Sequence, residues 1–379
     1  MATGIFGIGL LIDNVVLIAI LAGVFALLFM IIKVMPIAHY SYPSSRVRVM
    51  RGRMLGSEKI RELAESMDFK DVIGSFEGTG YEAFVAGKTE LSEIEKSLAL
   101  NLAQDYRAIV GMCPKHAAPF FKMVSSRYDT ENIKAIVAAK QAGGTASDFY
   151  PGPLSEAFLQ KLNDAGGIAE MIELLKATNY KEAVESLPQE VSPIEFQKAL
   201  DRHVFENLLR KRKIDEAART AGIMQDSQYL GKIYGMQVDL LNLKIILRCL
   251  KDDIVPEKTK AMLLKNGYFI SEKKAEALAE SSDIGAALGG LEGTPYQAVL
   301  SEKMRDFEKS GSLWHIEKAL DEFWAGKVKA YSIRQPFGLT PIACYLALKE
   351  TEISNLRAIL NGIRLGLPKE QIREMAIGV

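Results

Sequence analysis

The sequence predicts an all-helical protein made of three similar helical bundles, with one additional transmembrane helix at the N-terminus. Three observations predict this class: a charge-free apolar run, apolar residues at helical spacing along the rest of the chain, and three short blocks that each occur three times. The chain has 379 residues, which is too long for one hydrophobic core, so several domain-like units are expected.

The apolar run extends from Val15 to Ile32, VVLIAILAGVFALLFMII. At about 1.5 Å per residue it covers roughly 27 Å, close to the hydrocarbon thickness of a bilayer. The alternative is a cleaved signal peptide, but no Lys or Arg precedes the run and it exceeds the usual h-region. We therefore expect residues 1–39 to be a retained anchor. Lys33 and four arginines follow it, which predicts a body on the cytoplasmic side of the cell membrane.

The rest of the chain has the spacing of amphipathic helices. The apolar residues after Ile94 are Leu98, Leu102, Tyr106 and Ile109, which fall on one helix face. Glycine and proline gather at connectors such as 142–153 and 334–341. These features predict a helical body.

The first repeated block is DTENIKAIV at Asp129, DLLNLKIIL at Asp239 and EISNLRAIL at Glu352. Each copy is an acid, two free positions, an asparagine, Ile or Leu, and a base. The asparagines, roughly 110 residues apart, are Asn132, Asn242 and Asn355. We expect structural roles for this block, with the acid near a helix start, where it favours the positive end of the helix dipole or caps the helix.

Two further blocks precede each copy of the first. IEKSL, FQKAL and IEKAL contain Lys96, Lys198 and Lys318, and EGTGY, KATNY and EGTPY end at Tyr81, Tyr180 and Tyr296. The tyrosines are expected to end turns and to pack inward. The recurrence predicts helical bundles over 40–142, 143–250 and 251–379. Three such units suggest a pseudo-threefold body with a central hollow or funnel, and an open chain of three modules is the alternative.

No catalytic, cofactor-binding or metal-binding residues are predicted, and no small-molecule substrate. GTGYEAFVAGKT (78–89) resembles a P-loop, but Glu82 stands where the motif needs glycine. Cys113 and His116 supply only two possible metal ligands. The 47 basic and 47 acidic residues cancel, so nucleic acid is not an expected partner. The three scattered cysteines are typical of a reducing compartment.

The stretch after the anchor resembles a known family. YSYPSSRVRVMRGRML (Tyr40 to Leu55), followed by GSEKIRELAESMDFKDVIGSFEGTGY, is similar to the start of the C subunit of the archaeal and bacterial A/V-type rotary ATP synthases. Its eukaryotic relative is the d subunit of the vacuolar ATPase. The resemblance covers residues 40–379. It implies an all-helical, non-catalytic funnel of three bundles around a pseudo-threefold axis.

The resemblance also implies partners. Such a protein sits between the D and F subunits of the central shaft and the membrane ring of proteolipid subunits, and it couples the two during ion-driven ATP synthesis. The anchor departs from the family's shared core, and we expect it to lie inside or against the ring and to contact membrane lipid. The residues expected to face ring or lipid are Arg46, Arg48, Arg51 and Arg53.

Two other functions compete with the rotary socket. One is a membrane-anchored helical scaffold that binds other proteins, and the other is a membrane-tethered hydrolase without a recognisable motif. The hydrolase is disfavoured because no nucleophile, base and orienting group can be assembled from the sequence. Nothing in the residues distinguishes a proton from a sodium ion as the coupling ion.

Overall fold

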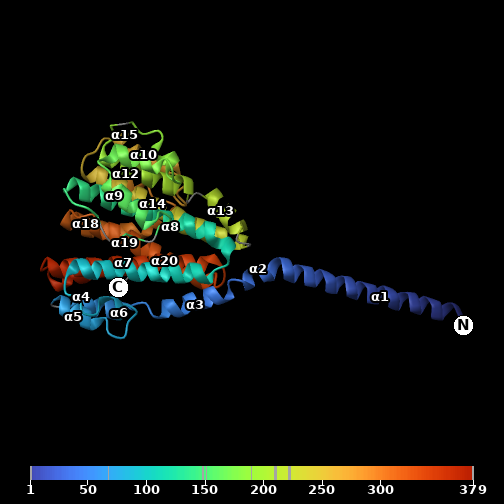
Figure 1. Cartoon of the computed structure of the whole chain (residues 1–379). Helices are drawn as coiled ribbons and strands as arrows, with labels where there is room; N and C mark the ends of the chain where they lie inside the picture. Colours follow the sequence, from blue (N-terminus) through green and yellow to red (C-terminus); the bar gives the residue numbers. More distant parts are fainter. Residues whose placement is uncertain are drawn as a thin grey trace.

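The computed structural model describes residues 2–66, 68–146, 149–150, 152–188, 190–208, 211–220 and 223–377. All regular secondary structure in these residues is helical, which confirms the predicted class. Figure 1 shows one long helical rod that leaves a body of packed helices.

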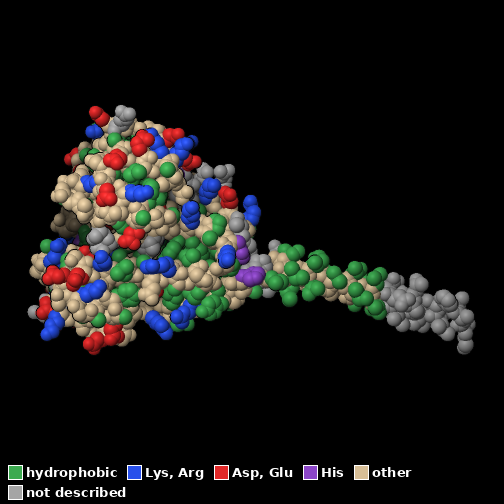
Figure 2. Space-filling model, viewed as in Figure 1, with side chains coloured by type: hydrophobic (Ala, Val, Ile, Leu, Met, Phe, Trp, Pro, Cys, Tyr) green, Lys and Arg blue, Asp and Glu red, His purple; other side chains and the backbone are tan. Residues whose placement is uncertain are grey.

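The rod is the N-terminal segment. It consists of α1 (Ala2–Phe29), a π-helical turn (Met30–Val34) and α2 (Met35–Ala38). The π-turn ends two residues before Pro36, which has no backbone N–H to donate to the preceding turn of an α-helix. Within the described residues, Val15–Ile32 is the span that is long and apolar enough to cross a membrane, and none of it is buried against the body. Figure 2 shows its apolar side chains standing clear of the body, whose charged residues are scattered.

Three long helices each contain one copy of the acid-x-x-Asn block: α8 (Ala118–Gln141), α14 (Ser227–Lys251) and α20 (Leu339–Arg364). Their N-terminal ends meet beside the anchor. Asp226, which precedes α14, accepts a 2.8 Å hydrogen bond from the backbone N–H of Leu339. His116, just before α8, lies edge-on to Tyr40, with 6.3 Å between ring centroids. The three helices therefore start at the end of the body from which the rod departs.

The remaining helices surround these three. Those before α8 are α3 (Ser41–Gly52), α4 (Ser57–Ala64), α5 (Phe69–Ser75), α6 (Glu82–Val85), α7 (Leu91–Met112) and the 3-10 turn Lys115–Ala117. Those between α8 and α14 are α9 (Glu156–Asp164), α10 (Ile168–Leu175), α11 (Lys181–Val184), α12 (Pro193–Arg202), a π-turn (His203–Leu208), α13 (Lys211–Thr220) and the 3-10 turn Met224–Asp226. The others are α15 (Pro256–Lys260), α16 (Glu272–Ala279), α17 (Ile284–Gly289), α18 (Pro295–Ser310), α19 (Trp314–Arg334) and α21 (Lys369–Met375).

Local sequence explains where many of these helices begin. Ser155 and Ser271 cap α9 and α16 by accepting hydrogen bonds from the third backbone N–H of each helix. Ser192 and Glu195 form a complete capping box at α12. Proline occupies the first turn of α8, α12, α15 and α18, where a missing N–H costs nothing.

The core is built from equivalent positions of the repeated blocks. The apolar residues that begin and end the IEKSL, FQKAL and IEKAL blocks are fully buried: Ile94, Leu98, Phe196, Leu200, Ile316 and Leu320. They lie on α7, α12 and α19, so these three helices pack through the same face. Burying one such side chain stabilises the folded state by about 1.5–3 kcal/mol.

Candidate functional site

Each repeated asparagine binds the backbone of a connector that follows its own helix. The side-chain oxygen accepts from one residue's N–H and the side-chain nitrogen donates to the same residue's carbonyl. The pairs are Asn132 with Tyr150 (2.8 and 2.9 Å), Asn242 with Leu264 (2.8 and 2.8 Å), and Asn355 with Ile377 (2.8 and 2.9 Å). An amide suits this contact because it carries a donor and an acceptor side by side.

Each repeated acid binds a repeated tyrosine. The hydroxyl of Tyr180 donates to Asp129 (3.0 Å), that of Tyr296 to Asp239 (2.9 Å), and that of Tyr81 to Glu352 (2.5 Å). Along the chain, each acid thus bonds to the tyrosine of the next copy, and the last acid bonds to the first tyrosine.

The same acids accept backbone N–H groups. The donors are Leu154 to Asp129, Phe269 and Ile270 to Asp239, and Leu55 to Glu352. Burial raises the pKa of Asp129 to about 7 and that of Asp239 to about 6. The acids lie in the middle of their helices, so the expectation that they sit near helix starts was wrong. Their partners are distant in sequence, which local pattern reasoning does not reach.

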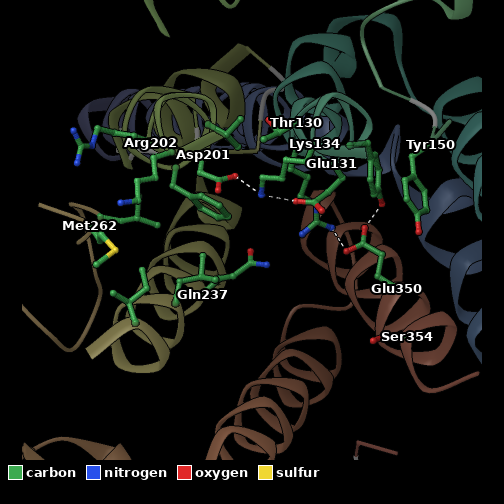
Figure 3. A pocket seen from close by; sticks show the side chains of 18 of the residues that line it. Thr130, Glu131, Lys134, Tyr150, Asp201, Arg202, Gln237, Met262, Glu350 and Ser354 are labelled. Atoms are coloured by element: carbon green, nitrogen blue, oxygen red, sulfur yellow. Dashed lines mark hydrogen bonds and ion pairs between the residues drawn. The ribbon is translucent and has the colours of Figure 1, made fainter. Parts of the chain in front are cut away.

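A cavity of about 550 Å³ lies where α8, α14 and α20 approach one another. Its wall includes Arg127, Gln237 and Glu350, which occupy the same position in the three copies, two residues before each acid. The wall also includes residues of α12, of the π-turn that follows it and of the connector 261–264 (Figure 3). The lining residues come from the middle of the long helices and the half farther from the anchor.

The carboxylates in this wall are paired with bases. Glu350 forms an ion pair with Arg127 and accepts a hydrogen bond from the hydroxyl of Tyr128. Lys134 lies between Asp201 (2.7 Å) and Glu131 (2.9 Å), as the dashed lines in Figure 3 mark. Burial opposes the charge of Lys134, but the two carboxylates outweigh it and raise the pKa of this ammonium. Burial raises the pKa of the carboxyls of Asp201 and Glu350, although Lys134 and Arg127 oppose the shift.

Aromatic stacking orders one side of the cavity. The rings of Tyr128 and Tyr150 are stacked, with centroids 5.8 Å apart and planes 22° from parallel. The guanidinium of Arg127 lies 5.4 Å from the ring centroid of Tyr128, and that of Arg357 lies 5.0 Å from that of Tyr150. Two cations thus bracket two stacked rings.

The repeated lysines do not share an environment. Lys96 and Lys198 are exposed on α7 and α12, and Lys198 lines the cavity. Lys318 is half-buried and donates to the backbone carbonyl of Glu374 (2.6 Å). Their recurrence in the sequence therefore does not mark one common contact.

The four arginines after the anchor divide into two faces of α3. Arg46 and Arg53 are exposed to solvent. Arg48 donates to the carbonyl of Pro336 (3.2 Å) and lies over the ring of Phe337, and Arg51 bonds to the hydroxyl of Ser332. Two of the four thus contact the body of the protein.

We examined the described residues for metal ligands and for a reactive cysteine. In the described ranges, no cluster of three or more His, Cys, Asp or Glu side chains is arranged to hold a metal ion. The three cysteines are free thiols, and burial raises the pKa of the half-buried Cys113 to about 12. A thiol with so high a pKa is a poor nucleophile at neutral pH.

Sequence reasoning missed the cavity residues Arg127, Gln237 and Glu350. The available signal was that all three occupy the same position of the repeat. Because three different residue types stand there, the position did not stand out as a shared one. The contacts show that this position faces inward in all three copies.

Residues 43–375 match the model of the ATP synthase (C/AC39) subunit family. Similar curated proteins carry the name of the C subunit of A-type ATP synthase. That of Methanocaldococcus jannaschii is 31% identical over 359 residues, covering 91% of this chain and 88% of the relative. That of Methanobrevibacter smithii is 31% identical over 353 residues (91% and 89%), and that of Pyrococcus abyssi is 30% identical over 345 residues (89% and 90%). The family match begins after the apolar rod.

Proposed function

Because this chain belongs to the ATP synthase (C/AC39) subunit family, we propose that it is a non-catalytic central-stalk component of an A/V-type rotary ATP synthase. In this role it is a socket that couples the D and F subunits of the shaft to the membrane proteolipid ring while an ion gradient drives ATP synthesis.

The proposal is supported chiefly by the positions of the apolar rod and the cavity along the three long helices α8, α14 and α20. The N-terminal ends of α8, α14 and α20 meet beside the rod, whereas the cavity lies in their middle and distal parts. A coupling protein needs an attachment to the ring at one end and a receptacle for the shaft away from it. This chain offers both.

The repeated contacts support a pseudo-threefold funnel. In each copy an acid binds a tyrosine and an asparagine binds a connector, and the last acid bonds to the first tyrosine. Such a closed set of contacts braces each unit against both neighbours. Close-packed helices with satisfied polar groups deform little, as the transmission of torque requires.

The anchor is proposed to stay in the cell membrane and to turn with the rotor. A helix fixed to the rotor but lying outside the ring would collide with the stator, so we place Val15–Ile32 inside or against the proteolipid ring. The basic residues that follow favour a body on the cytoplasmic side. The exposed Arg46 and Arg53 suit ring loops or lipid headgroups, whereas Arg48 and Arg51 brace α3 on the body.

The test is co-purification from gently solubilised native membranes through a C-terminal tag, followed by mass spectrometry. The proposal expects the nucleotide-binding subunits, D, F and the proteolipid at near-stoichiometric yield, and bait peptides from residues 1–33. Recovery with unrelated membrane proteins instead would favour the anchored scaffold. Turnover by the purified protein alone would favour a hydrolase.

A further inference from the structure

The base of the first repeated block is ion-paired in two copies and not in the third. Lys134 binds Asp201 (2.7 Å) and Lys244 binds Asp321 (2.6 Å). These aspartates directly follow the FQKAL and IEKAL blocks. The base of the third copy is Arg357, and the residue that would pair with it, directly after the IEKSL block of the first copy, is Ala99.

Arg357 is consequently a cation without its expected anion. Among the described residues, no carboxylate lies within ion-pair distance of it. Burial lowers the pKa of this guanidinium, and the more distant Glu95 offsets only part of the effect. Its Nε is buried without a hydrogen-bond partner. Leaving a buried donor unpaired is unfavourable, so the free protein holds Arg357 in a destabilised state that an incoming acceptor would relieve.

The position of Arg357 suits an incoming carboxylate. The residue lines the cavity, and its guanidinium lies over the ring of Tyr150, with Cζ 5.0 Å from the ring centroid. The contact with the ring restrains the guanidinium, and a guanidinium offers its terminal N–H groups in a fixed fork that matches the two oxygens of a carboxylate.

Two other residues of the cavity wall also carry a buried polar atom without a hydrogen-bond partner. These atoms are Nε of Arg127 on α8 and Oε1 of Gln237 on α14. The lining carboxylates Glu131, Asp201 and Glu350 are already ion-paired. The described carboxylates of the wall are thus taken, and the partner that Arg357 lacks is an anion, which an acidic side chain of an incoming polypeptide supplies.

We propose that Arg357 binds a carboxylate of the shaft end that enters this cavity. The inference rests on the proposed function and adds the chemistry of the contact. Because the other two equivalent bases are already paired, a shaft carboxylate meets a free guanidinium at one of three equivalent positions. Contact with this one guanidinium therefore favours one angular orientation of the shaft.

The experiment measures the affinity of the full-length protein, in mild detergent, for the recombinant D–F subcomplex of the same ATP synthase. Arg357→Gln is expected to weaken binding about tenfold or more, because truncating one partner of a buried charge pair has a large effect. Ala99→Asp supplies the missing internal carboxylate and is expected to weaken binding similarly. Ala99→Asn, of the same size without charge, and Arg364→Gln, at the exposed end of α20, are matched controls expected to change the affinity by less than about twofold.

The outcomes separate the two ideas. If the wild-type protein does not bind D–F, the proposed function fails and this inference fails with it. If the wild type binds and both Arg357→Gln and Ala99→Asp leave the affinity unchanged, only the carboxylate contact is overturned. If Ala99→Asp does not fold, the affinity of Arg357→Lys for D–F tests the carboxylate contact. This variant keeps the charge but loses the planar fork, so it should bind less tightly than wild type and more tightly than Arg357→Gln.

Discussion

Tyr81 and Glu352 lie 271 positions apart in the chain, yet the tyrosine hydroxyl donates a 2.5 Å hydrogen bond to the carboxylate. Glu352 also pairs with Lys349 (3.1 Å), whose ammonium lies 3.9 Å from the centroid of the Tyr81 ring. Asp129 and Asp239, the equivalent acids, have no base at ion-pair distance in the described part of the chain. Of the three acid–tyrosine contacts, the one between Tyr81 and Glu352 is thus the one that includes an ion pair.

Removing the Tyr81 hydroxyl should weaken this contact. Tyr81→Phe leaves the buried Glu352 with one acceptor site unfilled, so the free energy of unfolding is expected to fall by about 1–3 kcal/mol. Urea unfolding of the full chain in mild detergent, followed by circular dichroism, measures the change. Tyr42→Phe is the control, because Tyr42 is exposed and should shift the midpoint little. Equal midpoints for both variants would contradict the prediction.

The asparagine contacts should differ in strength with their burial. Asn242→Ala leaves both backbone groups of the buried Leu264 unpaired, and we expect a loss of about 2–4 kcal/mol. Asn355→Ala frees the same two groups of Ile377, but that residue is half-buried, so water replaces the lost bonds and the loss should be smaller. The same unfolding assay compares the two. A larger loss in Asn355→Ala would refute the burial argument.

Stability should depend on pH through Asp129. Burial raises the pKa of its carboxyl from 3.8 in the unfolded chain to about 7 in the folded protein. A raised folded pKa means that the stabilising contribution is complete below about pH 4 and is lost as the pH rises through 7. Over that window this group lowers the free energy of unfolding by up to about 1.4 kcal/mol per pH unit.

The variant Asp129→Asn should flatten that part of the stability profile, because its amide does not titrate. Thermal unfolding between pH 4 and pH 8 measures the slope. Asp252→Asn, an exposed position at the end of α14, should leave the slope as it is in the wild type. A wild-type slope in Asp129→Asn would show that another group carries the dependence.

A charge at the centre of Val15–Ile32 should weaken insertion of this segment into the membrane. Leu21 lies in the middle of Val15–Ile32 and is exposed, so Leu21→Lys adds a cost of about 2.5–3.5 kcal/mol to membrane insertion without touching the body. Less of the protein should remain in the membrane fraction after alkaline carbonate extraction. Leu100→Lys places the same charge on an exposed position of α7 and should extract like the wild type.

The sequence allowed the helical class and the period of the repeat to be predicted, because apolar spacing and recurring blocks are local properties. It did not show at which residue one repeated unit ends and the next begins. The boundaries 40–142, 143–250 and 251–379 stay a prediction, and the bonds Asp129–Tyr180, Asp239–Tyr296 and Glu352–Tyr81 all cross them. A period is visible in one chain, whereas the grouping of segments depends on which hydrogen bonds form across long separations.

The candidate site was less predictable. The partners of Asn132 and Asn242 are backbone groups of Tyr150 and Leu264, and a backbone amide has no signature in the sequence. The unpaired Arg357 did have one. Comparing the second block one residue further would have shown Asp201 and Asp321 against Ala99, but that difference has meaning only once the base and the aspartate are known to meet.

The joint between anchor and body has a mechanical consequence. The rod leaves the body from the N-terminal end of α3, and α3 is held by the buried Tyr40, Ser44 and Val47 and by the contacts of Arg48 and Arg51 (Figure 1). A pull on the rod passes through the two-residue turn at 39–40 and is then shared among these contacts along the length of α3. Force on the rod therefore reaches the start of α20 through the contacts of α3, among them the hydrogen bond from the backbone N–H of Gly338 to the hydroxyl of Ser44.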